Sequence, residues 1–286
     1  MKYCGKEFTP EDLHRIRVII KENPHKNRTK LSYQVCEEFN WYKPDGKLKD
    51  MSCRVALLRM EKDGRIQLPP PQTRNGNGKH CIEHTTHTEF GAPVTLSAGK
   101  LPELSIALVH TKQMSSLWNE YIDRYHYLGY KPLPGAQLRY IVYSGQTILA
   151  LLGFGAAAWK VAARDQFIGW TQEKRIRSLY LVVNNARFLI LPWIRSFNLA
   201  SKILGMISKR LPSDWEDRYC YRPVLLETFV ECNRFSGGAC YKAANWKYVG
   251  LTQGRGKLDQ KHEAKLPKKH IFLYPLNKQF RQLLCD

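Results

Sequence analysis

Residues 179–256 constrain the fold of this chain most, because they alternate apolar runs with amphipathic segments. One apolar run covers 179–191, where two adjacent asparagines interrupt it, and a second covers 223–231. Between these runs, residues 198–211 carry apolar side chains at helical spacing. Short apolar runs separated by a helix are typical of buried strands in a sheet that helices cover. The block therefore predicts the centre of a mixed sheet.

Polar side chains gather near the point where the two apolar runs would separate. They are Asn184, Asn185, Glu227 and Tyr241. Asn184 and Asn185 point to opposite faces of a strand, so at least one must be satisfied at a bulge or a binding site. Glu227 is the best candidate acid or base, because burial in an apolar strand raises a carboxyl pKa. A salt bridge from Glu227 to Arg187 or Arg234 is an equal alternative. The cluster predicts a site for a small ligand.

The charge balance indicates a polyanionic partner. Lysine and arginine number 45 against 25 acidic residues, a net charge of +20. Residues 1–70 carry about +5 and the remainder about +15, so the excess is spread along the chain. Self-repulsion of this size is offset when a polyanion binds, and nucleic acid is the commonest one. A merely basic soluble protein is the alternative.

The sequence also indicates the cellular compartment of the protein. The sequence contains neither eighteen consecutive apolar residues nor the apolar core of a signal peptide at its N-terminus. Its eight cysteines have irregular spacing, which predicts reduced thiols. We expect a cytoplasmic protein that binds no membrane. The histidines of residues 80–87 match no standard zinc spacing, so no metal site is predicted.

The chain divides into two parts joined by a linker. Residues 69–79 are rich in Pro, Gly and Asn without periodicity, and the polar stretch after them continues this character. With 43% hydrophobic residues, the chain can form a substantial core. The predicted organisation is a helical module at 1–70, a linker at 71–102 and a main domain at 103–286.

The first part reads as a small helical DNA-binding module. Thr9 followed by Pro and two acids is a helix start. Further helices are predicted at 29–39 and 51–61, and a short strand at 65–68. Three helices followed by a wing-like strand are the pattern of winged helix-turn-helix modules. A helical interaction domain with a solvated basic face is the alternative.

In the winged-helix interpretation, the third helix enters the DNA major groove. It carries Arg54 and Arg59 on its polar face, where they would contact DNA.

The main domain resembles the GNAT (N-acetyltransferase-like) fold. A helix-like segment from 102 to about 130, a hairpin over 137–155, the block described above and a strand at 270–274 give its order of elements. The predicted class is therefore α+β, with a winged-helix-like module followed by a GNAT-like mixed-sheet domain.

The GNAT resemblance implies a cofactor site and a catalytic tyrosine. GNAT enzymes hold the pyrophosphate of acyl-CoA in a loop of pattern Arg/Gln-x-x-Gly-x-Gly/Ala, where Arg195, Asn198 and Ala200 stand here. Asn198 replaces the first glycine of that pattern, which favours a non-enzymatic core. Tyr241 occupies the place of the family's general acid, and a packed aromatic residue is the alternative for it.

At a finer level the chain resembles the DruA family of the Druantia anti-phage defence system, also found beside or fused to transposases. The residues that carry this resemblance are YHYLGY at 125–130, GFGAAAW at 153–159, RDQFIGW at 164–170, NNARFLILP at 184–192, NLAS at 198–201, LETFV at 226–230, YKAANW at 241–246 and GRG at 254–256. The resemblance implies a bacterial DNA-linked protein of phage defence. Its partners would be other defence or transposition proteins.

Further residues are candidates for catalysis or nucleic-acid binding. His126 is a candidate general base, or a ring that stacks on a nucleobase, with a structural histidine as the alternative. Arg164 and Arg187 are candidate nucleic-acid contacts, although Arg164 equally suits an internal ion pair with its neighbour. The Gly-flanked loop with Arg255 and Lys257 suits phosphate, and a plain surface turn competes with that interpretation.

Two functional hypotheses follow, and a third, a nuclease or strand-transferase of transposition, is weaker because the sequence shows no acidic metal triad. In the first, the GNAT-like core transfers a group to nucleic acid, with Glu227, Tyr241 and His126 meeting in one pocket. In the second, the core is a non-catalytic DNA-recognition module that recruits partner proteins. The buried polar cluster favours the first, and Asn198 in place of glycine favours the second.

Overall fold

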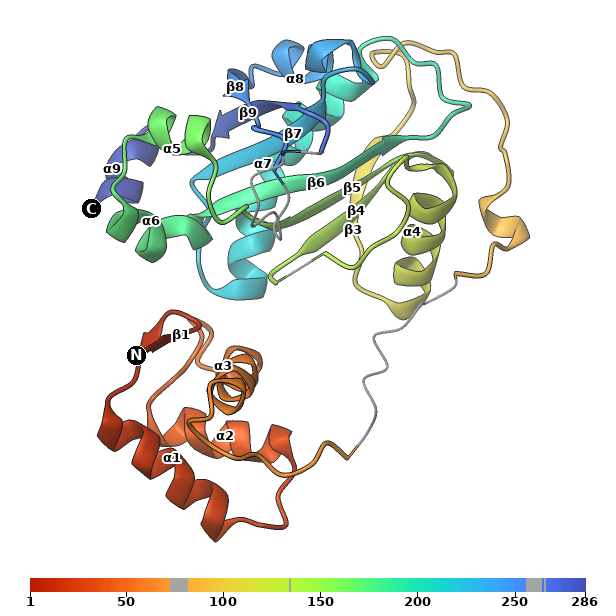
Figure 1. Ribbon diagram of the computed structural model, residues 1–286. Helices are drawn as coiled ribbons and strands as arrows, with labels where there is room; N and C mark the ends of the chain where they lie inside the picture. Colours follow the sequence, from red (N-terminus) through yellow and green to blue (C-terminus); the bar gives the residue numbers. More distant parts are fainter. Residues whose placement is uncertain (73–81, 134, 256–263, 265) are drawn as a thin grey trace. The chain divides into compact units, whose positions relative to one another are not determined.

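The computed structural model describes residues 1–72, 82–133, 135–255, 264 and 266–286. The chain forms two compact units, Met1–His80 and Cys81–Asp286 (Figure 1). Each unit encloses buried hydrophobic residues of its own. The sequence placed the end of the first module near residue 70 and the main domain from 103.

The N-terminal unit contains a two-stranded hairpin and three helices. They are β1 (Lys2–Tyr3), β2 (Lys6–Glu7), α1 (Pro10–Glu22), α2 (Arg28–Glu38) and α3 (Asp50–Lys62). The three predicted helices are confirmed. Thr9 begins α1 as expected, since its hydroxyl accepts from the Asp12 N–H while the Asp12 carboxylate accepts from the Thr9 N–H. Ile16, Leu31 and Met60 fill the core between the helices.

The predicted wing strand at 65–68 is not found in the described part of this unit. Ile66 and Leu68 turn into the core, and the Leu68 N–H donates to the Glu61 carboxylate at 3.0 Å. A side chain of helix α3 thus accepts the hydrogen bond of the Leu68 N–H, which a neighbouring strand would otherwise accept. The hairpin precedes α1 instead of following α3. The structure therefore shows a three-helix unit, and its role as a winged-helix module stays a prediction.

The second unit is built on a mixed sheet. Its strands, within the described residues, are β3 (Leu104–Leu108), β4 (Leu138–Ser144), β5 (Thr147–Ala156), β6 (Val182–Ile190), β7 (Leu225–Glu231), β8 (Lys247–Leu251) and β9 (Lys269–Pro275). They lie in the order β3-β4-β5-β6-β7-β9-β8, and β6 with β7 is the parallel pair in an otherwise antiparallel sheet. The hairpin predicted at 137–155 is found, and the strands predicted within 179–191, 223–231 and 270–274 correspond to β6, β7 and β9. The expected mixed sheet is present.

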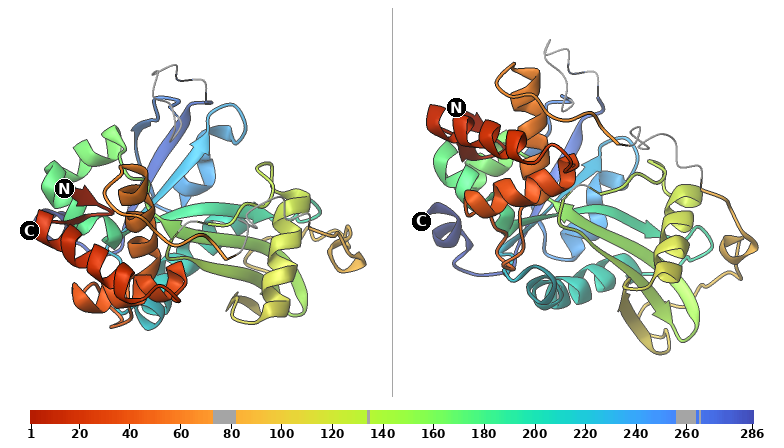
Figure 2. Two further views of the ribbon diagram at one scale, coloured as in Figure 1. Left: turned by 60° about the horizontal axis from the view of Figure 1, so that its bottom comes forward. Right: turned by 90° about the horizontal axis from the view of Figure 1, so that it is seen from below.

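Helices cover this sheet. They are α4 (Lys112–Tyr125), α5 (Ala162–Ile168), α6 (Gln172–Ser178), α7 (Leu199–Tyr219), α8 (Ala239–Ala243) and α9 (Phe280–Cys285). Helices α4, α7 and α8 share the main core, whereas α5 and α9 pack on a second cluster against β7 and β9, and α6 contacts α9. Figure 1 and both views of Figure 2 show α5, α6 and α9 together at one end of the sheet. No described helix combines the length and apolar character needed to cross a membrane.

Strand β3 differs from the prediction, which began a helix at residue 102. Residues 104–108 pair with β4 along their whole length, from Leu104 opposite Ser144 to Leu108 opposite Tyr140. Tertiary pairing therefore overrides the local helical pattern, and the helix begins at Lys112, where Thr111 accepts from the Met114 N–H.

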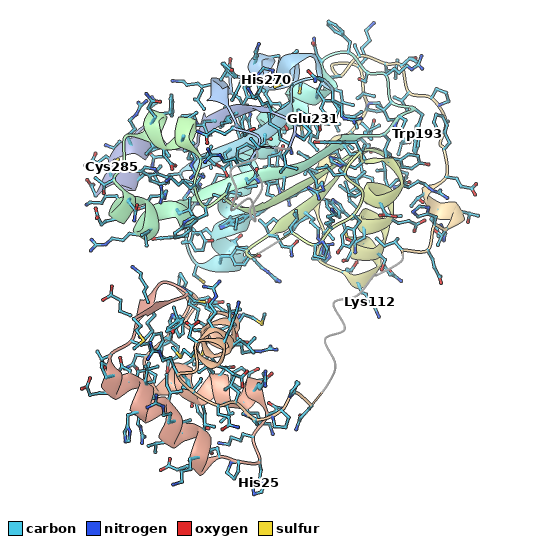
Figure 3. The ribbon with its side chains drawn as sticks, viewed as in Figure 1. His25, Lys112, Trp193, Glu231, His270 and Cys285 are labelled. Carbon is cyan, nitrogen blue, oxygen red and sulfur yellow. The ribbon has the colours of Figure 1, made fainter. Side chains whose placement is uncertain are left out.

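The segment before β3 also differs from the predicted linker at 71–102. From residue 85 onward it packs on the second unit, where Ala98 and Leu101 are buried. Trp193, labelled in Figure 3, contacts the rings of Phe90 and Tyr125 at centroid distances of 4.8 and 5.2 Å. Side chains from elsewhere in the fold thus order a segment that has no periodicity of its own. Such long-range contacts cannot be predicted from the local sequence.

The sheet separates between β6 and β7, as the asparagine pair indicated. These strands pair from Val182 opposite Leu225 to Asn184 opposite Glu227, and both continue beyond that point. On the other side of β6, Gly153 lies opposite Arg187 and Phe154 opposite Asn185, so one residue of β6 bulges. The separation and the bulge expose polar groups in the middle of the domain.

Candidate functional site

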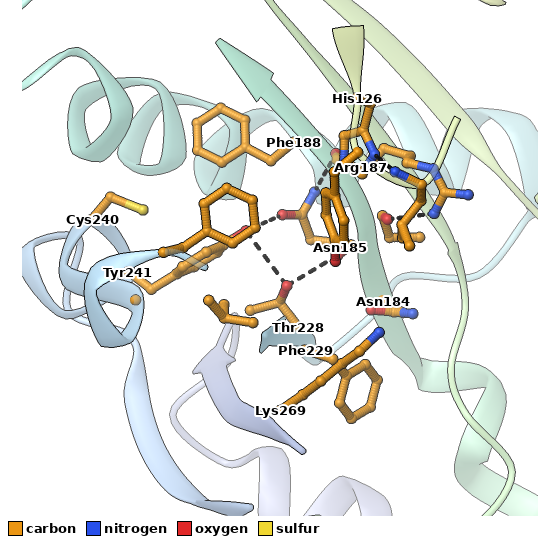
Figure 4. A pocket seen from close by; sticks show the side chains of 16 residues that line it. His126, Asn184, Asn185, Arg187, Phe188, Thr228, Phe229, Cys240, Tyr241 and Lys269 are labelled. Carbon is orange, nitrogen blue, oxygen red and sulfur yellow. Dashed lines mark hydrogen bonds between the residues drawn. The ribbon is translucent and has the colours of Figure 1, made fainter. Parts of the chain in front are cut away.

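A cavity of about 250 Å³ lies where β6 and β7 separate (Figure 4). Its walls come from both strands, from α8, from the residues after α4 and from the start of β9. The polar and charged residues that matter most here are His126, Asn184, Asn185, Arg187, Tyr241 and Lys269. Two of them are cations, and none of the described lining residues is a carboxylate. The cavity is therefore suited to an anionic or hydrogen-bonding ligand.

A hydrogen-bond network joins α8 to both strands at the cavity wall. The Tyr241 hydroxyl donates to Asn185 Oδ1 at 2.7 Å, and the Thr228 hydroxyl donates to the Asn185 carbonyl at 3.0 Å (Figure 4). The Tyr241 ring stacks on Phe272 at a centroid distance of 5.7 Å. Burial raises the pKa of Tyr241 well above its ordinary value. Tyr241 is thus a neutral phenol that holds Asn185 in place.

His126 lies at the end of α4, on the cavity wall. Its Nδ1 accepts from the Leu128 N–H at 3.2 Å, so the ring proton of the neutral imidazole is on Nε2. Burial, assisted by the Arg187 charge, lowers the pKa of His126 to about 4. His126 is consequently neutral near pH 7 and presents a hydrogen-bond donor rather than a strong base.

Two polar atoms of the cavity residues have no hydrogen-bond partner among the described residues. They are Asn184 Oδ1 and Arg187 Nε. Arg187 does use Nη1, which donates to the Ala186 carbonyl at 2.8 Å. Burial lowers the pKa of Arg187 from its ordinary value, although the group stays charged. Buried polar atoms without partners are costly, so a ligand that supplies partners is stabilised here.

An aromatic rim borders the cavity. The rings of Tyr127 and Phe235 meet edge to face at a centroid distance of 5.4 Å, and Phe235 remains 46% exposed. The Arg234 guanidinium lies over the Tyr127 ring, 4.7 Å from its centroid. Flat apolar faces with a cation beside them suit a planar ligand.

Glu227 lies elsewhere, in a buried ion pair. Its Oε2 is 2.8 Å from Arg164 Nη1, and Oε1 accepts from the Ala158 N–H at 2.8 Å. Both charged side chains are fully buried. Burial raises the pKa of the Glu227 carboxyl, and the Arg164 charge counteracts that shift. Thr228, the next residue on β7, lines the cavity, so Glu227 points to the opposite face of the sheet.

Two predicted roles are corrected by this pair. Glu227 does not line the cavity with Tyr241 and His126, and its partner is Arg164 rather than Arg187 or Arg234. Arg164, predicted to contact nucleic acid, is fully buried and also bonds the Asp165 carboxylate at 2.8 Å. Arg164 therefore holds α5 against β7. This agrees with the alternative prediction of an internal ion pair between Arg164 and its neighbour.

The loop expected to bind acyl-CoA is hydrogen-bonded to the segment before β3. The Arg195 N–H donates to the Val94 carbonyl at 2.8 Å, and the Phe197 carbonyl accepts from the Ala98 N–H at 3.0 Å. Asn198 adopts φ +61°, a left-handed conformation that asparagine tolerates. All of Arg195, Asn198 and Ala200 are described, and none lines the cavity. The segment before β3 thus occupies one N–H donor of this loop, that of Arg195.

Comparison with protein families decides the identity of the chain. The model described as "Druantia protein DruA" matches residues 59–263, which is more than half of the sequence. The chain belongs to the DruA family. No curated protein matches it.

Among solved structures, the DruA-family chain is similar to N-acetyltransferases. NAA60 of Arabidopsis thaliana in complex with acetyl-CoA is 10% identical with a TM-score of 0.42, covering 60% of this chain and 98% of that one. An N-acetyltransferase from Staphylococcus aureus Mu50 is 12% identical with a TM-score of 0.39, covering 62% and 100%. The ribosomal-protein-S18-alanine N-acetyltransferase of Escherichia coli is 10% identical with a TM-score of 0.37, covering 61% and 94%.

The remaining residues predicted to contact nucleic acid are Arg54, Arg59, Arg255 and Lys257, and none of those that the structure describes lines the cavity. In the N-terminal unit, Arg59 is exposed in the last turn of α3, whereas Arg54 is half-buried beside Met51. In the second unit Arg255 is exposed, and Lys257 lies outside the described residues.

Sequence reasoning missed Lys269 and Phe235. Lys269 directly precedes the predicted strand at 270–274, and only the pairing of β9 with β7 brings it to the cavity. Phe235 lies in an irregular segment between β7 and α8 that carried no pattern.

Proposed function

We propose that this DruA-family chain is a DNA-binding protein of bacterial anti-phage defence whose core holds nucleic acid at the β6–β7 cavity. The observation that carries the proposal is the cavity lining, which combines Arg187 and Lys269 with aromatic rings and has no carboxylate among its described residues. Cations beside flat apolar surfaces are the combination with which proteins hold nucleic-acid strands.

The charge distribution supports the same conclusion. About three quarters of the +20 net charge falls on the residues after 70, in which the cavity lies. A surface of this kind attracts phosphate, releases counterions on binding and loses affinity steeply as salt rises.

The N-terminal unit supplies a second contact in this proposal. Its helix α3 ends with Arg59 exposed, and Arg54 lies half-buried on the same helix. We assign α3 to the DNA duplex, in the manner of a winged-helix module, with arginines contacting phosphates or base edges. The unit would then hold the chain on DNA while the core engages the strand.

The geometry favours recognition over group transfer. Glu227 is neutralised in a buried pair away from the cavity, and the pKa of His126, about 4, makes it a weak base. The Tyr241 proton is engaged by Asn185. The Arg195 N–H donates to the Val94 carbonyl and is not free for an acyl-CoA phosphate. A recognition module of this kind would recruit other defence or transposition proteins in the cytoplasm.

A binding experiment tests the proposal. The full chain is titrated with labelled DNA and, separately, with acetyl-CoA over a series of salt concentrations. We expect salt-sensitive DNA binding that Lys269→Met weakens about threefold to tenfold, since one cationic contact is lost. Lys247→Met is the matched control, because Lys247 is exposed on β8 and does not line the cavity. Absence of DNA binding at low salt, or acetyl-CoA binding that Asn198→Ala abolishes, would overturn the proposal.

A further inference from the structure

We propose that the β6–β7 cavity receives one unpaired nucleobase, turned out of its strand, so that the core distinguishes unpaired from paired nucleotides. This inference rests on the proposed DNA-binding function and names the part of the nucleic acid that enters the cavity.

The size of the cavity limits what can enter. Its volume of about 250 Å³ falls just below the roughly 300 Å³ at which ligand pockets for drug-sized molecules begin. A single planar base fits this space, whereas a whole dinucleotide-sized cofactor does not. The strand that carries the base must therefore remain outside.

The rim fits a base that enters from a strand. Phe235 presents its ring at the border of the cavity, edge to face with Tyr127, whose ring also contacts the His126 ring at 4.9 Å and the Arg234 guanidinium at 4.7 Å. Phe235 is 46% exposed, which leaves it available for stacking. Stacking on aromatic rings is open to unpaired bases, since bases in a duplex already stack on their neighbours.

The interior provides groups for a base edge. Asn184 Oδ1 is an acceptor without a partner, and Arg187 Nε is a donor without one, among the described residues. His126 is neutral and carries its ring proton on Nε2, which makes it a second donor. A base edge presents donors and acceptors side by side and can satisfy such a set.

Lys269 adds a positive charge that can contact the phosphate backbone of the nucleic acid. It lies at the start of β9, opposite Glu231 of β7, and lines the cavity together with Asn184. Figure 4 shows both side chains at the end of the cavity away from Cys240. A phosphate that flanks the inserted base would meet this ammonium group.

The test compares four DNAs of one sequence, each about 20 nucleotides long. They are a single strand, a perfect duplex, a duplex with one unpaired central nucleotide, and the same duplex with that nucleotide abasic. Affinity for the full chain is measured by fluorescence anisotropy. We expect the single strand and the unpaired nucleotide to bind about tenfold more tightly than the perfect duplex, and the abasic site to lose this gain.

Variants locate the effect at the cavity. Phe235→Ala should remove the tenfold preference for the unpaired nucleotide. Phe197→Ala, a matched change at a residue that is 76% exposed and does not line the cavity, should keep it. Thermal unfolding of each variant establishes that it is folded.

The outcomes separate this inference from the proposed function. Equal affinity for all four DNAs, or a preference that survives Phe235→Ala in a folded protein, overturns the nucleobase site and leaves DNA binding standing. Failure to bind any of the DNAs overturns the proposed function itself.

Discussion

The carboxylate of Glu227 and the guanidinium of Arg164 lie 2.8 Å apart, and both side chains are fully buried. Arg164 comes from α5, and Glu227 lies on β7 opposite Asn184, at the last paired position before β6 and β7 separate. The ion pair thus anchors β7 from the face opposite the cavity. A splayed sheet needs such an anchor, because its strands lack mutual hydrogen bonds where they diverge.

Replacing Glu227 by glutamine should destabilise the protein rather than remove a catalytic step. The change leaves the buried Arg164 charge compensated only by Asp165, and losing one partner of a buried pair costs about 3 kcal/mol. We expect a corresponding fall in the free energy of unfolding, measured with denaturant. Glu231→Gln on the same strand is the control, since its pairing with the exposed Arg234 at 3.8 Å is worth at most about 1 kcal/mol. Equal losses for the two variants would contradict the assigned role.

The pH dependence of stability should reflect the lowered pKa of His126. Its pKa of about 4 in the folded chain lies below the ordinary value of about 6.5 that holds on unfolding. The unfolded state therefore binds the proton first, and stability present above about pH 6.5 is lost as the pH falls toward 4, by about 2–3 kcal/mol. His126→Asn should flatten this part of the profile. An NMR titration that gives His126 a pKa near 6.5 would refute the prediction.

Tyr241→Phe should weaken the cavity wall without changing its shape. The variant leaves Asn185 Oδ1 without the donor that now lies 2.7 Å away, which costs about 1–2 kcal/mol of stability. Tyr248→Phe, at a ring that is 48% exposed, should change stability by less than about 0.5 kcal/mol. Denaturant unfolding of both variants measures the difference, and a silent Tyr241→Phe would argue against the network.

Arg59→Ala should weaken DNA binding about equally for all sequences if the arginine contacts phosphate. The slope of log affinity against log salt should then fall by about one. Arg15→Ala is the control, because Arg15 is already paired with Glu38 at 2.7 Å in the same unit. Equal slopes for the parent chain and Arg59→Ala would show that Arg59 contacts no phosphate and would contradict the assignment of α3 to the DNA interface.

Much of the fold follows from local sequence. The apolar runs that became β6 and β7, the helical spacing of α7 and the capped start of α1 all have a physical signature in neighbouring residues. The two asparagines marked the separation of the strands, because a buried strand does not tolerate unsatisfied amides. Of the three residues predicted to share one pocket, Tyr241 and His126 line the cavity and Glu227 does not.

What local sequence could not provide was the partner of each group. Arg164 and Glu227 are 63 residues apart, and nothing near either one indicates the pair. Strand β3 and the ordered segment at 85–101 likewise depend on contacts with β4, α4 and Trp193. Lys269 reaches the cavity only through strand pairing. Long-range pairing therefore decided which predicted residues form the site.

Photo-crosslinking tests the central claim most directly. DNA that carries 5-iodouracil at one unpaired position is irradiated with the full chain, and the modified peptides are mapped by mass spectrometry. We predict adducts at Tyr127 or Phe235 on the cavity rim, lost when unlabelled single-stranded DNA competes. Adducts confined to the N-terminal unit, with the residues of the cavity unmodified, would contradict nucleic-acid binding at the β6–β7 separation.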